Sequence, residues 1–354
     1  MMYSLDEIGL IPAATSSIKH RADVNPFYGD KLPIFVAPMT CLIDLDNWRT
    51  FEQSRVTPIW PIRDANNPER EVPSKFGPYW MAVTIEEFKR LFNNCEADIC
   101  VPHHYYRVLI DCANGNMEEL FSLVKNAKEK YGNKLVVMIG NIANPLTYLQ
   151  CCGAGVDYVR VGIGGGSGCT TSVQTGIHAS MPWILEGIAE LKKWVPITKA
   201  ALGTKSKISF ESFLDCCKGA VRTKIVADGG ITNPSRAIKC LALGADYVMI
   251  GKAFAHCKEV NHMRISSPET GIRNQYYGQS SEQGQLDRFG KVKANPEGTS
   301  VMVSVDTTLK EFTDKFEAAL RSAMSYCGAE TLNDFIGKVK YEYMSPDEFR
   351  AYNK

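Results

Sequence analysis

The sequence lacks an excess of charge of either sign. Its 354 residues hold 40 Lys and Arg against 39 Asp and Glu, a formal net charge of +1. A chain without a basic surplus has no electrostatic signature of nucleic-acid binding or of attachment to an anionic membrane. It also lacks an apolar run long enough to cross a bilayer, and its first residues lack the basic and apolar regions of a signal peptide. We therefore expect a cytoplasmic protein with no nucleic-acid or membrane partner.

Metal-ligand spacing is missing among the cysteines. The chain has 12 cysteines, but none lies in a Cys-x-x-Cys pair or in a Cys/His pattern typical of zinc sites. In a cytoplasmic protein such cysteines are usually reduced and buried as small apolar residues. We expect this of nearly all of them, with Cys169 as the exception.

Short, continuous apolar runs recur along the chain, with amphipathic stretches such as 117–131 and 234–243 between them. Such runs are typical of strands buried on both faces of a parallel sheet. Strands that alternate with helices predict βαβ units, and eight of them predict an α/β fold, a single (β/α)8 TIM barrel over residues 1–354. The predicted strands are residues 33–39, 56–60, 79–83, 108–112, 135–140, 158–162, 224–228 and 247–251.

Two stretches depart from this alternation. Residues 194–211 look like an insertion, and residues 266–301 are polar and glycine-rich with few strand or helix signals. Long irregular segments in compact enzymes often cover the active site. We therefore expect residues 266–301 to form an active-site lid or flap.

A glycine-rich loop follows the sixth predicted strand and carries Cys169. In (β/α)8 barrels the active site lies at the carboxyl ends of the strands, and residues 162–171 read GIGGGSGCTT at this position. Glycines allow close approach of the backbone to a ligand, and a thiolate on such a loop could act as a nucleophile. A lone cysteine is more often structural, but the loop and the flanking Thr170 and Thr171 favour the nucleophile.

The last two predicted strands end in glycine. Asp228, Gly229 and Gly230 follow the seventh, and Gly251 and Lys252 follow the eighth. Loops after these two strands commonly bind phosphate in barrels. The glycines could instead make only tight turns, but their occurrence at adjacent strand ends favours a phosphate site, with Asp228 accepting from ribose hydroxyls.

Several motifs in a fixed order resemble one family. Eight segments closely resemble motifs of the IMP dehydrogenase/GMP reductase family. They are APM at 37–39, IDCANG at 110–115, GIGGGSGCTT, IVADGG, ADYVMIGKAFA, YYGQSSEQG, NPEG and LRSAMSYCGA. The resemblance runs nearly end to end and is strongest from about residue 109 to 329. It implies a purine nucleoside monophosphate as substrate, NADPH or NAD as cofactor, a bound potassium ion and a homotetramer.

The resemblance also implies a role for each motif residue. Cys169 would attack C2 of the purine, and Thr171 with Glu297 would form a proton-transfer pair. Without the resemblance, Glu297 would be interpreted as a solvated carboxylate. The other implied positions are Asp228 for the ribose; Gly229, Gly230, Gly251 and Lys252 for the phosphate; Gly278, Gln279 and Ser280 for the base; Asp111 and Asn114 for the nicotinamide; and the carbonyls of Gly164, Gly166 and Cys169 for potassium.

Within the family, two features favour GMP reductase. Most IMP dehydrogenases carry a regulatory module after the second strand, where this chain has only the short loop 63–78. The segment between Tyr277 and Glu297 is also short for a mobile flap that delivers an Arg–Tyr pair. Against this, Arg288 and Phe289 could be an altered form of that pair. The alternatives are an IMP dehydrogenase without the module, a catalytically inactive nucleotide-binding barrel and an unrelated phosphate-binding barrel enzyme.

Overall fold

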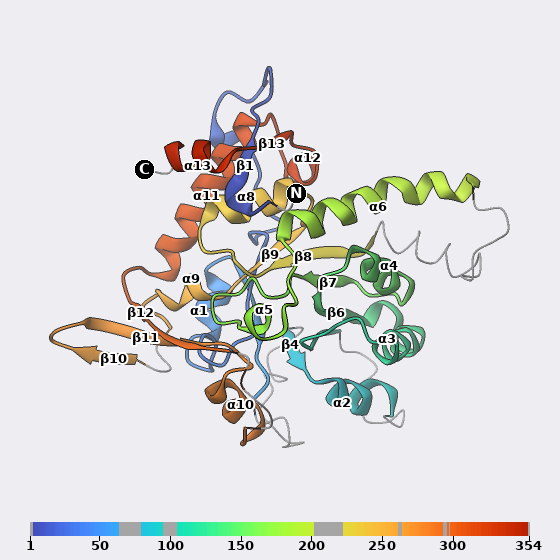
Figure 1. The fold of residues 1–354 in the computed structure, drawn as a ribbon, viewed down its shortest axis with the longest axis vertical. Coiled ribbons are helices and arrows are strands. Elements are labelled where there is room, and N and C mark those ends of the chain that lie inside the picture. Colours follow the sequence, from blue (N-terminus) through green and yellow to red (C-terminus); the bar gives the residue numbers. More distant parts are fainter. Residues whose placement is uncertain are drawn as a thin grey trace.

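Eight parallel strands close into a barrel at the centre of the molecule (Figure 1). The computed structural model describes residues 3–63, 79–94, 105–201, 222–260, 264–292, 296 and 298–352. Neighbouring strands follow the chain order, and the last pairs with the first. This confirms the predicted TIM barrel and all eight predicted strands. They are β2 (Ile34–Val36), β3 (Thr57–Trp60), β4 (Trp80–Val83), β5 (Tyr106–Asp111), β6 (Leu135–Ile142), β7 (Tyr158–Val161), β8 (Lys224–Asp228) and β9 (Tyr247–Ile250).

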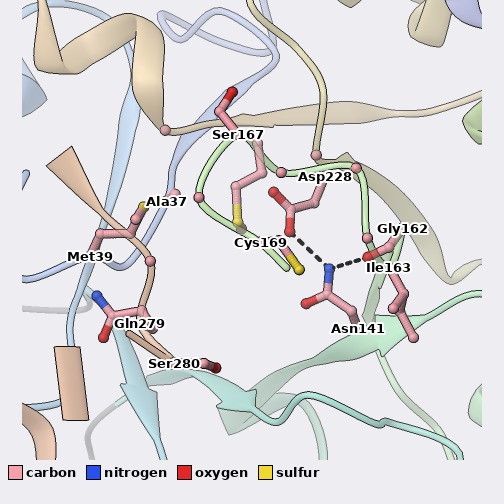
Figure 2. A pocket seen from close by; sticks show the side chains of 18 of the residues that line it. Ala37, Met39, Asn141, Gly162, Ile163, Ser167, Cys169, Asp228, Gln279 and Ser280 are labelled. Atoms are coloured by element: carbon pink, nitrogen blue, oxygen red, sulfur yellow. Dashed lines mark hydrogen bonds between the residues drawn. The ribbon is translucent and has the colours of Figure 1, made fainter. Parts of the chain in front are cut away.

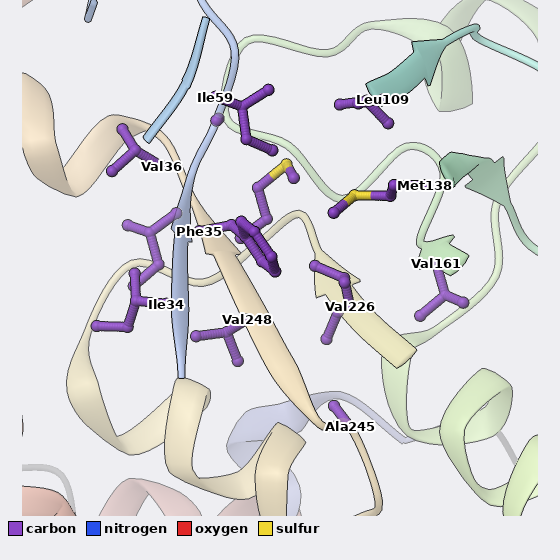
Figure 3. Close-up of a cluster of buried hydrophobic side chains, with 14 of the residues drawn as sticks. Ile34, Phe35, Val36, Ile59, Leu109, Met138, Val161, Val226, Ala245 and Val248 are labelled. Carbon is purple, nitrogen blue, oxygen red and sulfur yellow. The ribbon is translucent and has the colours of Figure 1, made fainter. Parts of the chain in front are cut away.

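The strands are apolar throughout because both of their faces are buried. Successive side chains point to opposite faces of a strand, and Figure 3 shows Phe35 inside the barrel while Ile34 and Val36 point the other way, toward the helices. Ile34 and Val36 are completely buried and Phe35 is 2% exposed. Removing each such side chain from water contributes roughly 1.5–3 kcal/mol, so the barrel walls are a rigid support for the loops above them.

Amphipathic helices cover the outside of the barrel. In α3 (Glu118–Tyr131) the apolar side chains at helical spacing, Leu120, Leu123, Val124 and Ala127, are all buried, as predicted. In α8 (Pro234–Ala242) the Asn233 side chain accepts from the Arg236 amide and caps the helix, and Pro234 occupies its first turn. The other helices along the barrel are α1 (Trp48–Gln53), α2 (Ile85–Phe88), α4 (Pro145–Gly153), α5 (Thr171–Thr175), α6 (Met181–Ala201), α9 (Lys252–Ala255) and α11 (Leu309–Tyr326).

The segment predicted to be irregular, 266–301, is largely ordered secondary structure. It contributes to an antiparallel sheet of β10 (Arg264–Ser267), β11 (Gly271–Tyr277) and β12 (Ser300–Ser304), and it contains helix α10 (Glu282–Phe289). The sheet projects from the barrel and most of β10 is exposed, so burial requires no continuous apolar run in that strand. Of the predicted insertion, residues 194–201 extend α6 and residues 202–211 lie outside the described residues.

The two ends of the chain meet beside the barrel. Strand β1 (Ile8–Leu10) pairs with β13 (Tyr341–Tyr343), and Arg236 Nε of α8 donates to Asp6 Oδ1 at 2.8 Å. Among the helices that the structure describes, none combines the length and the apolar character needed to span a membrane. The remaining elements are the short helices η1 (Leu5–Glu7), η2 (Arg21–Asp23), η4 (Lys89–Asn93), η5 (Gly132–Lys134), α12 (Leu332–Phe335) and α13 (Pro346–Tyr352).

Candidate active site

A pocket opens at the carboxyl ends of the barrel strands and brings most of the predicted site residues together (Figure 2). Asn114 is exposed and does not line this pocket, and Glu297 lies outside the described residues. The predicted residues that line it are Asp111, Gly164, Gly166, Cys169, Thr171, Asp228, Gly229, Gly230, Gly251, Lys252, Gly278, Gln279 and Ser280.

The loop after β7 holds Cys169 in place through its backbone. The Cys169 amide donates to Gly166 O at 3.0 Å, and Thr299 N donates to Gly168 O at 3.0 Å. Cys169 also forms an isolated antiparallel bridge with Gly298. The Cys169 Sγ–H donates to Thr171 Oγ1 at 3.3 Å. The thiol is therefore presented to the pocket beside a hydroxyl that accepts its hydrogen bond.

Two of the other described cysteines have thiols whose pKa is raised by burial. All eight cysteines that the structure describes are free thiols; five of them are buried, while Cys112, Cys169 and Cys327 are partly exposed. Burial raises the pKa of Cys41 to about 12. Burial and the neighbouring Asp111 carboxylate raise the pKa of Cys112, which also lines the pocket, to about 11. These two remain protonated thiols near neutral pH and are poor nucleophiles.

The loop after β8, which is predicted to bind phosphate, lies directly against the cysteine loop. Gly229 has a φ of +103°, and a Cβ atom there would lie 3.2 Å from Gly166 N, so only glycine fits this contact. Gly230 O accepts from Arg236 Nη1 at 2.8 Å, which ties the β8 loop to α8. Cys169 and the residues predicted to bind the phosphate therefore line the same pocket.

Arg160 of β7 forms an ionic bridge that the sequence analysis missed. Its Nε lies 2.8 Å from Asp228 Oδ2 and its Nη1 lies 2.7 Å from Asp111 Oδ1. Burial alone would lower the pKa of Arg160, but the carboxylates of Asp228 and Asp111 outweigh burial and raise it. Burial alone would raise the pKa of Asp111, but the guanidiniums of Arg288 and Arg160 hold it below its ordinary value. Arg160 and Asp111 therefore keep their charges in this buried contact.

Asn141 is the second residue that was missed. Its Nδ2 donates to Asp228 Oδ2 at 2.8 Å and to Gly162 O at 2.6 Å, the two contacts drawn in Figure 2. It therefore ties the end of β8 to the start of the cysteine loop. A signal for Asn141 and Arg160 was present, because each is a polar residue near the carboxyl end of a strand that is otherwise apolar.

Helix α10 supplies one more charged side chain to the pocket. Arg288 Nη2 donates to the backbone oxygen of Asp111 at 3.0 Å and lies 3.4 Å from Asp111 Oδ2. The side chain of Arg288 is 13% exposed, and Arg288 lines the pocket. The segment predicted to form a flap therefore closes the pocket on the side of Asp111.

Fold and site together define a (β/α)8-barrel protein with a cysteine-bearing, glycine-rich pocket at the carboxyl ends of its strands. Residues 82–350 match the model of the IMP dehydrogenase / GMP reductase domain, and the chain belongs to this family. The two enzymes in the family's name are NAD(P)-dependent oxidoreductases. This agrees with the class of enzyme expected from the sequence.

Relatives that carry both names match the chain. An inosine-5'-monophosphate dehydrogenase of Borreliella burgdorferi is 30% identical over 261 residues, which cover 69% of this chain and 56% of the relative. A GMP reductase of Clostridium acetobutylicum is 26% identical over 352 residues, 96% of this chain and 95% of the relative. A GMP reductase of Klebsiella pneumoniae is 28% identical over 249 residues, 70% of this chain and 63% of the relative. The chain thus spans about half the length of the dehydrogenase (56%) and nearly the full length of the first reductase (95%).

Proposed function

We propose that this protein is a GMP reductase, which converts GMP and NADPH to IMP, ammonia and NADP⁺ through a covalent adduct on Cys169. The observation that carries the proposal is the position of Cys169, which lines the same pocket as two glycine loops suited to a nucleoside monophosphate. The choice of the reductase is supported by the end-to-end match with the Clostridium enzyme. It is also supported by the short connection between β3 and β4, residues 61–79, which leaves no room for a module there.

Substrate binding in this proposal uses the loops after β8 and β9. The amides of Gly229, Gly230 and Gly251 and the ammonium group of Lys252 hold the phosphate dianion, because charge-assisted hydrogen bonds are the stronger kind. Asp228 is held in place by Arg160 and accepts from the ribose hydroxyls. The backbone of Gly278, with Gln279 and Ser280, contacts the base. The purine C2 is then held over the Cys169 sulfur.

The first chemical step exchanges the C2 amino group for sulfur. Cys169 Sγ attacks C2, and its proton is relayed through the Thr171 hydroxyl, whose Oγ1 lies 3.3 Å away and which gives up its own proton in turn. Thr171, with Glu297, delivers one proton to the leaving amino group. The C2–N bond breaks, ammonia leaves, and the C2–S bond remains.

The second step replaces sulfur with hydrogen at C2. When bound, NADPH supplies a hydride to this carbon. The C2–S bond then breaks, its electron pair returns to Cys169 as a thiolate, and IMP is released. Asp111 and Arg288 line the part of the pocket that is proposed for the nicotinamide. Asn114 does not line the pocket and is proposed to contact the cofactor outside it.

Further expectations from the resemblance belong to the same proposal. A potassium ion would be held by the carbonyls of Gly164, Gly166 and Cys169, because carbonyl oxygens can replace the hydration shell of this ion. Gly166 O accepts only the Cys169 amide among the described groups, so one of its lone pairs is available. The remaining proposals are that residues 1–354 act as one catalytic domain, assemble as a homotetramer and work in the cytoplasm.

An IMP dehydrogenase is the second candidate, and Arg288 is the observation in its favour. A dehydrogenase must hydrolyse its adduct with water, and a guanidinium in the pocket, as Arg288 is, could help to activate that water. In this case IMP and NAD would give XMP. The neighbouring Phe289 lacks the hydroxyl group of the Tyr expected for that chemistry.

One pair of assays separates these candidates. The protein is incubated with GMP and NADPH, and separately with IMP and NAD, while the absorbance of the reduced nicotinamide and the release of ammonia are followed. We expect NADPH consumption with one ammonia per turnover in the first mixture only. XMP formation in the second mixture alone would support the dehydrogenase. Nucleotide binding without turnover in either mixture would support an inactive barrel.

A further inference from the structure

Helix α10 is anchored to the body of the protein by the carboxylate of Asp287. Asp287 Oδ2 accepts from Tyr277 Oη at 2.6 Å and from Thr40 Oγ1 at 2.7 Å. Its Oδ1 accepts from Gln283 Nε2 at 2.9 Å. Tyr277 and Thr40 are completely buried. Burial alone would raise the pKa of Asp287, but these hydrogen bonds outweigh it and lower the pKa, so the carboxylate accepts them in its charged form.

The start of α10 is fixed by steric contact as well. Ser281 caps the helix by accepting from Gly284 N at 3.1 Å, and its hydroxyl donates to Gly278 O at 2.6 Å. A Cβ atom on Gly284 would lie 2.5 Å from Gly278 O and 2.7 Å from Gln279 O. The helix therefore packs backbone against backbone on the turn that is proposed to contact the purine base.

The loop that carries Thr40 is itself held in place. Arg63 Nη2 donates to Thr40 O at 2.8 Å and to Ile43 O at 2.7 Å. Asp287 thus connects α10 to the loop after β2 and, through Tyr277, to strand β11. These contacts suit a helix that keeps one position and do not suit a flap that swings out of the pocket.

Arg288, which follows Asp287 in the chain, contacts Asp111. Its Nη2 makes the two contacts described above. Its guanidinium lies over the Phe289 ring, with Cζ 5.5 Å from the ring centroid. Its buried Nε has no hydrogen-bond partner among the described residues, and no hydrogen bond of Nη1 is found in the part of the chain that the structure describes. Buried donors are rarely left unpaired without a reason. One side of the guanidinium is therefore oriented by Asp111, and Nη1 remains for a ligand in the pocket.

We propose that Arg288 is a stationary part of the nicotinamide subsite, held there by Asp287, and not a group that enters only after the cofactor leaves. This inference rests on the proposed function. The group that Nη1 recognises is an uncharged acceptor on the nicotinamide half of NADP⁺, of which the carboxamide oxygen is one. Arg288 is in this sense a cofactor-binding residue, and Asp287 is a positioning residue that acts through it.

The test measures ligand binding to the full chain without turnover. Affinities for GMP, for NADP⁺ and for 2'-phospho-ADP-ribose, which lacks the nicotinamide, are determined by calorimetry for the wild type, Arg288→Met, Asp287→Ala and Asp287→Asn. Leu286→Ala serves as a matched control on α10, because Leu286 is 41% exposed. Circular dichroism and thermal unfolding check that each variant is folded.

We expect Arg288→Met and Asp287→Ala to weaken NADP⁺ binding about tenfold, the loss that follows from one hydrogen bond to a charged group. The affinities of these variants for GMP and for 2'-phospho-ADP-ribose should stay unchanged. The NADP⁺ affinity of Asp287→Asn should lie between those of the wild type and Asp287→Ala. Leu286→Ala should bind NADP⁺ as tightly as the wild type. Three results for Arg288→Met and Asp287→Ala would overturn the proposal. The affinity for NADP⁺ could be unchanged, the affinity for 2'-phospho-ADP-ribose could fall as much as that for NADP⁺, or the affinity for GMP could fall as much as that for NADP⁺.

Failure of the proposed function has a different signature. In that case the wild type itself fails to bind NADP⁺, or binds both ligands without converting GMP. Absence of NADP⁺ binding by the wild type would also overturn the inference. Binding without conversion leaves the comparison of variants intact, so the role of Arg288 is decided independently of turnover.

Discussion

Arg160 joins Asp111 to Asp228, with Nη1 2.7 Å from one carboxylate and Nε 2.8 Å from the other. Asp111 lies on the proposed nicotinamide side of the pocket and Asp228 on the proposed ribose side. One guanidinium therefore sets the position of both carboxylates. All three side chains are less than a fifth exposed, at 13%, 12% and 17%, so the bridge is weakly screened by solvent.

Replacing Arg160 should destabilise the protein strongly. In Arg160→Met both carboxylates lose their shared partner, and breaking a buried ion pair from one side typically costs about 3–5 kcal/mol. Arg160→Lys should cost less, because the ammonium group can reach one carboxylate but not both. Arg107→Met is the control, since Arg107 is exposed on β5. Urea unfolding measures these differences, and a stable Arg160→Met variant would contradict the account.

The same variant should show a characteristic dependence on pH. The pKa of Asp111 is lowered in the folded protein, so its stabilising contribution is present above the unfolded pKa of about 3.9 and is lost as pH falls through the folded value. Arg160→Met removes part of that lowering. The stability gap between wild type and variant should therefore shrink as pH falls from about 6 to about 3. A gap that widens on acidification would show that the Arg160 guanidinium does not lower this pKa.

The barrel could be predicted because its strands are buried on both faces. A strand such as β8, with Ile225, Val226 and Ala227 all buried, must be a continuous apolar run, and such a run is visible in the sequence. The sheet of β10, β11 and β12 gives no such signal. Its strands pair with each other outside the barrel, and β11 is exposed at its start and buried only toward its end, so no continuous apolar run marks it in the sequence.

The candidate site was predictable where glycines and motifs mark it. Cys169, Asp228 and the glycines of three loops do line one pocket. Arg160 was not predicted because one charged residue in an apolar run identifies no partner, and its two carboxylates are 49 and 68 residues away in the chain. The contact of Arg288 with Asp111 spans 177 residues. Only the closed barrel brings these side chains together.

The phosphate loops predict a large difference between nucleotide and nucleoside. GMP should bind at least about a hundredfold more tightly than guanosine, because hydrogen bonds to a charged group contribute about 1.5–3 kcal/mol each. Lys252→Ala should reduce this preference by weakening GMP binding and leaving guanosine binding unchanged. Calorimetry with both ligands tests this. Equal affinities in the wild type would reject the assignment of the loops after β8 and β9.

Gly284→Ala should destabilise α10 although alanine is the better helix former. Helix propensity alone predicts a gain of about 1 kcal/mol. The added Cβ would lie 2.5 Å from Gly278 O, so either the helix or the turn must move. We expect lower stability and weaker GMP binding, while Leu286→Ala on the same helix should change neither. A Gly284→Ala variant with increased stability and normal GMP affinity would show that α10 packs loosely.

The central claim is that Cys169 forms a covalent bond to the purine, and mass spectrometry of the intact protein tests it most directly. The wild type, Cys169→Ala and Cys112→Ala are each mixed with GMP, quenched with acid and weighed. If the adduct forms on Cys169, the mass of the wild type and of Cys112→Ala increases by the mass of GMP less that of ammonia. The account predicts no adduct and no turnover in Cys169→Ala, with GMP still bound. Turnover of GMP by Cys169→Ala, or an adduct that depends on Cys112, would contradict it.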